Sequence, residues 1–251
     1  MLIPGYEPSI SIIIPCFNEA GNAELVVTRL AELRSEVNIP FEAIFVDGCS
    51  NDGTPERLRT AIAEHSMEQI VSVHVMSSKR GYGYDIMHGL RQARSNVLSW
   101  THADMQTDIK DVFTAYDRLK ALEFQCEKVF VKGKRLNRPI VDAIFTFGMQ
   151  LFTLAAIRVN LHDINAQPKV FTRAFFDNHL SKGAPNDFSL DLFALFHAKI
   201  RGYQIETIPV YFRARQFGEA KGGGGGLKLR FALIRRTTKY ILKLSSQRFK
   251  T

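Results

Sequence analysis

Strand-like and helix-like patterns alternate through the first 135 residues of this 251-residue chain, and this alternation constrains its fold more than any other feature. Short β-branched apolar runs predict strands, and longer stretches with apolar side chains at helical spacing predict helices between them. The predicted strands are residues 9–15, 41–46, 69–76, 96–100 and 128–131, and the predicted helices are residues 20–36, 54–64, 84–94 and 109–122. This alternation is typical of an α/β protein whose mostly parallel sheet is covered by helices on both faces.

The pattern changes after Arg135. Residues 140–157 are apolar apart from a few polar positions and one charge, a length that could just span a bilayer. The polar residues recur at helical spacing and form one stripe, so we expect a helix packed on the body, or lying in a membrane interface, rather than a spanning helix. Further elements are predicted at residues 168–172 (strand), 190–201 (helix) and 204–212 (strand).

The charge is concentrated at the carboxy terminus. The net charge is +8, and residues 220–251 hold nine Lys and Arg residues and no acidic one, so the rest of the chain is nearly neutral. Such a tail binds phosphates of a nucleic acid, an anionic membrane or a charged substrate. The glycine run 222–226 predicts a hinge, or a loop that orders on a ligand. Residues 227–244 predict a basic amphipathic helix, either on a membrane surface or packed on the body.

Three classes of protein are disfavoured: disulfide-bonded or zinc-stabilised proteins, secreted proteins and nucleic-acid-binding modules. The three cysteines (Cys16, Cys49 and Cys126) lie far apart without metal-ligand spacing, so we expect neither a disulfide framework nor a structural zinc site. The first residues lack a basic start followed by an apolar core, so no secretory signal is expected. The aromatic residues of the basic tail show no repeated stacking pattern, which argues against a nucleic-acid-binding module.

Polar side chains follow the first two predicted strands. Pro15-Cys16-Phe17-Asn18-Glu19 comes directly after the first strand, and capping of the next helix is the alternative role for Asn18 or Glu19. Asp47 lies at the tip of the second strand, where a carboxylate is well placed to accept hydrogen bonds from a nucleotide base or ribose. The turn Asp52-Gly53-Thr54 that follows is interpreted as a helix start.

A third cluster follows the strand that ends at Trp100. Side chains two residues apart in an extended segment point the same way, so His102, Asp104 and Gln106 can converge on one point. One or two carboxylates, water and phosphate oxygens hold a divalent cation on a diphosphate. For Asp108 we prefer a capping role at the start of the next helix.

A fourth cluster holds four cations close together after residue 131. Lys132, Lys134, Arg135 and Arg138 would form a positive site of the size of a phosphate. A solvated run of charges is the alternative.

The ordered set of motifs resembles a known family. IIIPCFNEAGN, IFVDGCSNDGT, KRGYGYDIMHGL, THADMQ and VKGKR occur in the order and spacing of family-2 glycosyltransferases with a GT-A fold. The chain is most similar to their polyprenyl/dolichyl-phosphate glycosyltransferase branch, to which dolichyl-phosphate mannosyltransferase belongs. DINAQPKVFTR, NDFSLDLFALFHAKIRGY, IPVYFRAR and RQFGEAK fit the same branch, so the likeness covers about residues 9–245.

The resemblance implies roles for individual residues. The segment that holds the nucleotide matches Pro15, Phe17 and Glu19, and the aspartate that contacts base or ribose matches Asp47. The metal site matches Asp104 and Gln106, with Mn²⁺ or Mg²⁺ as the divalent cation. Basic positions around the donor diphosphate and the acceptor phosphate match Arg135, Arg138, Arg215 and Lys221, and Lys221 with its glycines would close over the donor.

Two positions depart from the family pattern. His102 stands where the family usually has the first aspartate of its metal motif; histidine ligates Mn²⁺ but suits Mg²⁺ less well. Gly48 replaces a frequent second aspartate after Asp47, which removes one contact to the ribose.

These observations predict an inverting glycosyltransferase that moves a sugar from a nucleotide-diphosphate donor to a polyprenyl phosphate on an anionic membrane surface, with no nucleic-acid partner. A lipid phosphate is already an anionic nucleophile, whereas a glycan hydroxyl, the alternative acceptor, would need a general base such as Asp187 or Asp191. Capping by Asp187 and a surface position for Asp191 are the structural alternatives, and a nucleotide-sugar-binding protein without turnover is a further candidate.

The predicted organisation has two parts. Residues 1–219 form the GT-A domain, with a nucleotide-binding half (1–135) and an acceptor-side half (136–219), and residues 220–251 form the glycine-rich loop and the basic helix. The expected location is cytoplasmic, peripherally associated with the cytoplasmic face of a membrane.

Overall fold

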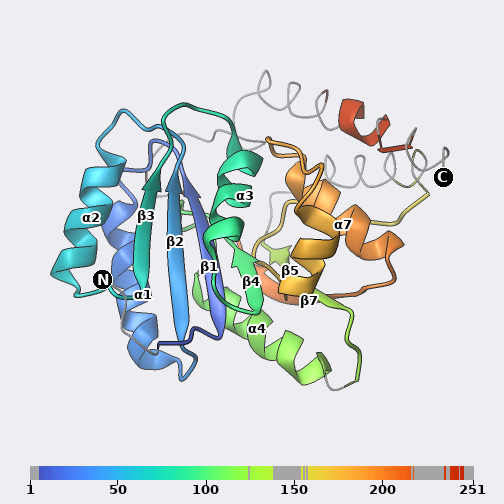
Figure 1. Ribbon diagram of the computed structural model, residues 1–251, viewed down its shortest axis with the longest axis horizontal. Coiled ribbons are helices and arrows are strands. Elements are labelled where there is room, and N and C mark those ends of the chain that lie inside the picture. The colour runs from blue at the N-terminus through green and yellow to red at the C-terminus, as the bar shows by residue number, and fades with distance from the viewer. Residues whose placement is uncertain are drawn as a thin grey trace.

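The computed structural model describes residues 6–123, 125–137, 154, 156, 158–215, 217, 235, 238–242 and 244–245 (Figure 1). Its strands are β1 (Ile10–Cys16), β2 (Phe41–Asp47), β3 (Val71–Val75), β4 (Val97–Trp100), β5 (Val129–Leu136), β6 (Lys169–Thr172) and β7 (Gln204–Tyr211). Its helices are α1 (Ala23–Glu36), α2 (Thr54–Glu64), α3 (Tyr82–Gln92), α4 (Lys110–Glu123), α6 (Arg173–Phe175), the π-helix η1 (Phe176–Leu180) and α7 (Leu190–Ile200).

The described strands form one sheet in the order β3-β2-β1-β4-β6-β5-β7. β1 pairs in parallel with β2 and β4, β2 pairs in parallel with β3, and β5 pairs in parallel with β7. Among these strands β6 alone runs antiparallel to its neighbours, β4 and β5. The predicted α/β class and the mostly parallel sheet are therefore confirmed.

Apolar side chains cover both faces of the sheet. Ile12 belongs to a cluster with side chains of α1, α2 and α4, whereas its neighbour Ile13 belongs to a cluster with side chains of α3 and α7. Successive side chains of a strand point to opposite faces, so β1 is buried on both sides. This is why β1 reads as a continuous apolar run in the sequence. Figure 1 shows α1 and α2 on the side of β3, and α7 on the side of β7.

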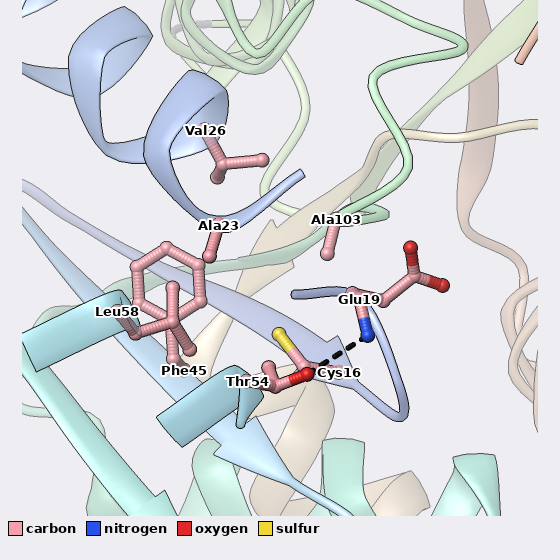
Figure 2. A pocket seen from close by; sticks show the side chains of 8 residues that line it. All are labelled: Cys16, Glu19, Ala23, Val26, Phe45, Thr54, Leu58 and Ala103. Carbon is pink, nitrogen blue, oxygen red and sulfur yellow. Dashed lines mark hydrogen bonds between the residues drawn. The ribbon is translucent and has the colours of Figure 1, made fainter. Parts of the chain in front are cut away.

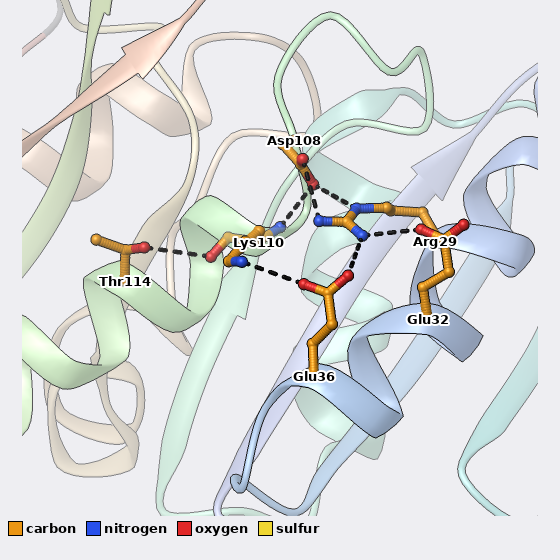
Figure 3. Close-up of polar contacts among 6 residues, drawn as sticks. All are labelled: Arg29, Glu32, Glu36, Asp108, Lys110 and Thr114. Atoms are coloured by element: carbon orange, nitrogen blue, oxygen red, sulfur yellow. Dashed lines mark hydrogen bonds and ion pairs between the residues drawn. The ribbon is translucent and has the colours of Figure 1, made fainter.

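The loop before α4 ties two helices together. Asp108 Oδ1 accepts hydrogen bonds from the backbone N–H of Lys110 and from Arg29 Nε, both at 3.0 Å (Figure 3). Arg29 of α1 also pairs with Glu32 and Glu36 at 2.8 Å. Asp108 therefore serves at the start of α4, as expected, and anchors that start to α1.

The predicted end of the strand at Val131 is wrong, because β5 continues to Leu136. Its pairing with β7 continues from Lys132 to Leu136. A side chain at Gly133 would lie 2.0 Å from the carbonyl oxygen of Gln167, so glycine at this position allows β5 to pass close to that segment.

This extension gives the cations of the fourth cluster different environments. Lys132 is buried within β5, whereas Lys134 is exposed. The sequence predicted these cations after the end of a strand, but the three that the structure describes, Lys132, Lys134 and Arg135, lie within β5.

Several predicted elements fall outside the described residues. Of the apolar segment 140–157, only residues 154 and 156 are described, and the glycine run 222–226 is not described. Among the residues described, no helix is both long and apolar enough to cross a bilayer.

The described part of the predicted basic helix contacts the body. Residues 238–242 are helical, and the side chains of Ile241 and Leu244 are buried in the cluster of α3 and α7. Arg235 and Lys239 are exposed. This end of the helix therefore packs by its apolar side and presents basic side chains to the surroundings.

Candidate active site

The direction in which the chain adds strands reverses between β1 and β4, which lie side by side. In open α/β sheets, ligands bind outside the carboxyl ends of the strands at such a switch point. β1 ends at Cys16, β4 ends at Trp100, and β2 ends at Asp47, which pairs in register with Cys16. The first three predicted polar clusters therefore leave the sheet at one edge.

Hydrogen bonds join the loop after β1 to the loop after β2. The backbone N–H of Asn18 donates to Ser50 Oγ at 2.8 Å, and that of Glu19 donates to Thr54 Oγ1 at 2.9 Å. Figure 2 shows this second bond and the Glu19 carboxylate pointing away from the apolar side chains beneath the loop. Those side chains come from Ala23, Val26, Phe45 and Leu58. Hydrogen bonds and apolar contacts therefore hold the loop in place, and its Glu19 carboxylate points away from the apolar side chains.

The predicted nucleoside residues lie on this edge. Asp47 is fully buried, and its Oδ2 accepts the backbone N–H of Ser50 at 2.8 Å. Pro15 pairs opposite Val46 in the sheet, one residue before Cys16. Asp47 is therefore held rigidly at the end of β2.

Lys79 joins this group, although the sequence analysis does not single it out. Its Nζ lies 3.6 Å from the centre of the Phe17 ring. A cation above an aromatic face is electrostatically favourable. Lys79 belongs to the segment KRGYGYDIMHGL, so the motif indicates its neighbourhood but not its contact.

Arg215 bridges the loops after β1 and β4. Its Nη2 lies 2.6 Å from Asp104 Oδ2 and 3.5 Å from Gln106 Oε1, and its Nη1 lies 3.6 Å from Glu19 Oε1. Asp104 is almost fully buried, and its Oδ1 accepts the backbone N–H of Gln106 at 3.1 Å. Oxygen atoms from both sides of the switch point therefore surround one positive charge.

This donor set suits a hard divalent cation. Carboxylate and amide oxygens are preferred ligands of Mg²⁺ and Mn²⁺, and the guanidinium shows that the arrangement accommodates a cation. Among the described residues, no group of three or more His, Cys, Asp and Glu side chains is arranged to hold a metal. His102 lies with its ring centre 5.9 Å from that of Tyr82. The structure thus brings together Asp104 and Gln106 of the three predicted ligands.

Asp191 is the centre of a buried polar network. Its Oδ1 accepts hydrogen bonds from Lys169 Nζ and Gln167 Nε2, both at 2.8 Å, and from Trp100 Nε1 at 3.3 Å. Lys169 and Asp191 are both buried. Asp191 is thus not on the helix surface, and its engagement with Lys169 disfavours it as a proton acceptor.

Tyr82 connects this network to the site. Gln167 Nε2 contacts the Tyr82 hydroxyl at 3.2 Å, and the Tyr82 ring stacks on Phe188 with centres 4.6 Å apart. Burial, and then the negative charges of Asp191 and Asp104, raise the pKa of Tyr82 well above its usual value. Tyr82 is therefore a neutral hydroxyl between the two carboxylates.

Asp187 precedes α7. Its Oδ1 accepts the backbone N–H of Ser189 at 2.8 Å. This bond spans two residues and closes an Asx turn ahead of α7. The N-cap of α7 is Ser189, so the capping alternative for Asp187 is wrong.

Arg135 is paired with Asp163. Its backbone N–H and its Nε each donate to the Asp163 carboxylate at 2.9 Å, and its Nη2 contacts the same group. Although burial acts to raise the pKa of Asp163, the hydrogen bonds and charge of Arg135 lower it overall. Arg138 and Lys221, the other predicted cations, lie outside the described residues.

Lys132 is a second buried lysine near this pair. Its Nζ donates to the carbonyl oxygen of Gly133 at 2.8 Å. Burial, and then the charge of Lys169, lower the pKa of Lys132 to about 7. The local sequence predicts Lys132 as part of a phosphate site and gives no sign of its burial.

The sequence model of the family described as Glycosyl transferase family 2 matches residues 11–176 of the chain. The chain belongs to this family. The match includes the end of β2, which carries Asp47, and the loops after β1 and β4, which carry Glu19 and Asp104. The predicted enzyme class, a glycosyltransferase, is therefore confirmed.

Curated relatives fall in the branch that the resemblance indicates. The chain is 30% identical over 232 residues to a dolichol-phosphate mannosyltransferase from Mycosarcoma maydis, covering 86% of this chain and 74% of the relative. It is 26% identical over 222 residues to an undecaprenyl-phosphate mannosyltransferase from Micrococcus luteus, covering 85% and 87%.

Solved structures share the fold. A mannosyltransferase from Pyrobaculum calidifontis, in complex with GDP-Man and Mn²⁺, matches with a TM-score of 0.61 and 21% identity, over 87% of this chain; the chain spans 60% of that protein. Glucosyl-3-phosphoglycerate synthase from Mycobacterium tuberculosis, in complex with Mn²⁺, UDP-Glc and phosphoglyceric acid, matches with a TM-score of 0.71 and 16% identity, over 95% of this chain and 80% of that one. The predicted GT-A fold is confirmed.

Proposed function

We propose that this glycosyltransferase transfers a sugar from a nucleotide-diphosphate donor to a polyprenyl phosphate at a membrane surface, with inversion at the anomeric carbon. The observation that carries the proposal is the convergence of Glu19, Asp104 and Gln106 on one cation at the switch point of the sheet. The names of the relatives support the lipid phosphate acceptor.

The nucleoside is assigned to the loops after β1 and β2. Phe17 offers an aromatic face, and Asp47 offers a fixed carboxylate that accepts hydrogen bonds from base or ribose. Pro15 and Glu19 hold the loop in place on the adjoining strand end. These groups bind and orient the donor without taking part in bond cleavage.

The diphosphate is assigned to the loop after β4. Asp104 and Gln106 would hold a divalent cation there, with His102 as a third ligand, and the cation would stabilise charge on the departing diphosphate. Arg135 and Lys221 are the proposed cationic partners of the diphosphate. Preorganised positive charge near a leaving group lowers the barrier because no solvent must reorient during the reaction.

Arg215 is the proposed partner of the acceptor phosphate, together with Arg138. Arg215 forms ion pairs with Asp104 and Glu19 in this structure. It would exchange these partners for phosphate oxygens when donor and acceptor bind. The basic side chains of Arg235 and Lys239 would favour an anionic membrane surface, where the acceptor resides.

The transfer needs no general base. An oxygen of the acceptor phosphate attacks the anomeric carbon opposite the diphosphate, a carbon–oxygen bond forms, and the bond to the diphosphate oxygen breaks. No proton has to be removed from a phosphate oxygen that is already anionic. The pairing of Asp191 with Lys169 agrees with this, since a glycan hydroxyl would require a carboxylate available to accept a proton.

The test is a transfer assay with purified protein, Mn²⁺ and radiolabelled GDP-mannose or UDP-glucose. Polyprenyl phosphate in detergent or liposomes, phosphoglyceric acid and an oligosaccharide serve as separate acceptors. We expect a labelled product that partitions with the lipid. Transfer to the oligosaccharide or to phosphoglyceric acid instead would overturn the acceptor assignment, and binding without any transfer would make the protein a sugar-nucleotide binder.

Asp104→Asn provides the companion variant. We expect a loss of about 10²–10³-fold in turnover, the magnitude typical when one electrostatic stabiliser is removed. Asp108→Asn is the matched control, since Asp108 follows the same strand but contacts Arg29 and the start of α4. Equal activity in both variants would remove Asp104 from the diphosphate site.

A further inference from the structure

The carboxyl group of Asp85 occupies the space beside Gly48. A Cβ atom at position 48 would lie 2.7 Å from Asp85 Oδ2, closer than such atoms approach in proteins. A side chain at 48 would therefore require the carboxyl group of Asp85 to turn away from its observed position. Gly48 directly follows Asp47, so the Asp85 carboxyl lies against the end of β2.

Asp85 is buried without a full set of partners. Its side chain is 4% exposed, and its Oδ1 has no hydrogen-bond partner among the described residues. Burying a polar atom without a hydrogen bond costs free energy, so native structures rarely contain such groups unless they have a functional use. An alanine here would avoid this cost.

The position of Asp85 is fixed by its helix. It lies in the first turn of α3, whose side chains Ile86, Met87 and Leu90 are buried in the cluster of α7. The backbone N–H of the preceding residue, Tyr84, also donates to the carbonyl oxygen of Asn186 at 3.1 Å. The carboxyl cannot leave its place by a movement of α3 without disturbing this packing.

The charges around Asp85 come from the predicted nucleoside site. Burial, and then the negative charge of Asp47, raise the pKa of Asp85 to about 7, while the positive charge of Lys79 acts to lower it. Lys79 is also the cation above Phe17. Asp47, Asp85, Lys79 and Phe17 thus form one neighbourhood at the ends of β1 and β2.

We propose that Asp85 supplies a second carboxyl group to the nucleoside site, in the space that Gly48 leaves open. Its oxygen accepts a hydrogen bond from an N–H or O–H group of the donor's nucleoside. This inference rests on the proposed function. It explains together the missing side chain at 48 and the buried atom without a partner. A bound nucleoside would provide the hydrogen bond that Oδ1 lacks, so Asp85 would contribute to specificity between donors.

The first test measures equilibrium binding of nucleoside diphosphates to the wild type and to Asp85→Ala. GDP, IDP and UDP differ in the N–H groups of the base, and 2′-deoxy and 3′-deoxy GDP each lack one ribose hydroxyl. We expect one of these changes to weaken binding to the wild type by about tenfold or more, and the same change to have no effect in Asp85→Ala. GDP against IDP identifies a base contact, and the deoxy analogues identify a ribose contact. Equal ratios in wild type and variant would overturn the inference.

The second test exchanges the two positions. Gly48→Asp alone should lose nucleotide binding, because its side chain meets the Asp85 carboxyl, whereas Gly48→Asp combined with Asp85→Ala should regain at least part of it. If the double variant binds nucleotide as weakly as the worse single variant, the two side chains do not compete for this space. Asp111→Asn is the control: Asp111 is a carboxyl in the first turn of α4 whose pKa is raised to about 6, mainly by burial, and it should leave all nucleotide affinities unchanged.

Nucleotide binding by the wild type distinguishes failure of the role of Asp85 from failure of the proposed function. If the wild type binds nucleoside diphosphates and Asp85→Ala binds each of them equally well, the inference fails and the proposed transferase remains. If the wild type binds none of them, with or without Mn²⁺, both fail.

Discussion

The two sides of the sheet's carboxyl edge treat buried negative charge differently. On the side of β4, β5 and β6, three carboxylates each have a cationic partner: Asp104 with Arg215, Asp163 with Arg135, and Asp191 with Lys169. On the side of β1 and β2, Glu19 shares Arg215 with Asp104. The two carboxyl groups beside the end of β2 differ: Asp47 accepts hydrogen bonds from the neutral Ser50, and Asp85 has a buried oxygen without a partner among the described residues. These two carboxyl groups define what we call the unpaired side.

The difference follows the chemistry expected of each side. Phosphates require cations, and cations in an apolar fold require carboxylates to balance them until the phosphates bind. A nucleoside presents neutral N–H and O–H groups, which match carboxyl groups without cationic partners. The paired side therefore suits the diphosphate and the acceptor, and the unpaired side suits the base and ribose.

Breaking the most buried pair should have the largest effect. Lys169→Met leaves Asp191 charged and without its cation, which costs about 3–5 kcal/mol of the free energy of unfolding. We expect a lower midpoint in urea denaturation, followed by circular dichroism.

The same position offers an internal control. Lys169→Met combined with Asp191→Leu removes both charges and should recover most of the stability. If the single variant is as stable as the wild type, the pair does not hold the paired side together.

Removing Arg215 should change metal binding at the paired side of the site. Arg215→Met leaves Asp104 and Glu19 without the cation between them, so Mn²⁺ should bind about tenfold more tightly, a change of about 1.4 kcal/mol. Transfer should fall, since the acceptor loses its partner. Mn²⁺ binding measured by electron paramagnetic resonance gives the affinity.

Arg213→Met is the matched control. Arg213 is exposed, and its backbone N–H, not its side chain, donates a hydrogen bond to the carbonyl oxygen of Gln106. Unchanged Mn²⁺ affinity in Arg215→Met would show that the guanidinium and the metal do not share a site.

On the unpaired side, Asp85 should make the stability of the protein depend on pH. The pKa of Asp85 is raised from 3.8 to about 7 in the folded chain, mainly by burial and then by Asp47. Between these values the unfolded chain has lost the proton and the folded chain keeps it, so the wild type loses stability as pH rises. The melting-temperature advantage of Asp85→Asn should grow from pH 4 to pH 7 and then level off, at about 2–4 °C for each kcal/mol. An advantage that does not vary with pH would contradict the assignment.

The smallest effect is expected at the membrane. Arg235→Gln and Lys239→Gln each remove an exposed charge worth about 1 kcal/mol near an anionic surface, so sedimentation with phosphatidylserine liposomes should weaken roughly fivefold for each. Arg118→Gln is the control, since Arg118 pairs with Glu206 on the body. Equal binding by all three variants would make this helix a packing element only.

The sequence predicted the unpaired side better than the paired side. Periodicity locates β2, and Asp47 needs only the end of that strand to be placed. The pairs of the other side join residues far apart in the chain, such as Asp191 with Lys169, and no local pattern specifies such a partner. A single lysine inside the apolar strand QPKVF is a signal of a buried pair, although it does not identify the carboxylate.

The cluster after Val131 shows the same limit of local patterns. Four cations close together in the sequence suggested one positive site, but β5 includes Lys132, Lys134 and Arg135, and the adjacent side chains of Lys134 and Arg135 point to opposite faces. The contact between Gly48 and Asp85 also depends on how α3 packs on the sheet, which the sequence does not specify.

The most direct measurement is the melting temperature of the wild type and of Asp104→Ala with a nucleoside diphosphate, in Mn²⁺ and in chelator. A ligand that binds only the folded state raises the melting temperature by mass action. The account predicts a rise for the wild type that is larger in Mn²⁺ than in chelator, and the loss of this metal-dependent part in Asp104→Ala. No rise with any nucleoside diphosphate, or an undiminished metal-dependent rise in Asp104→Ala, would contradict it.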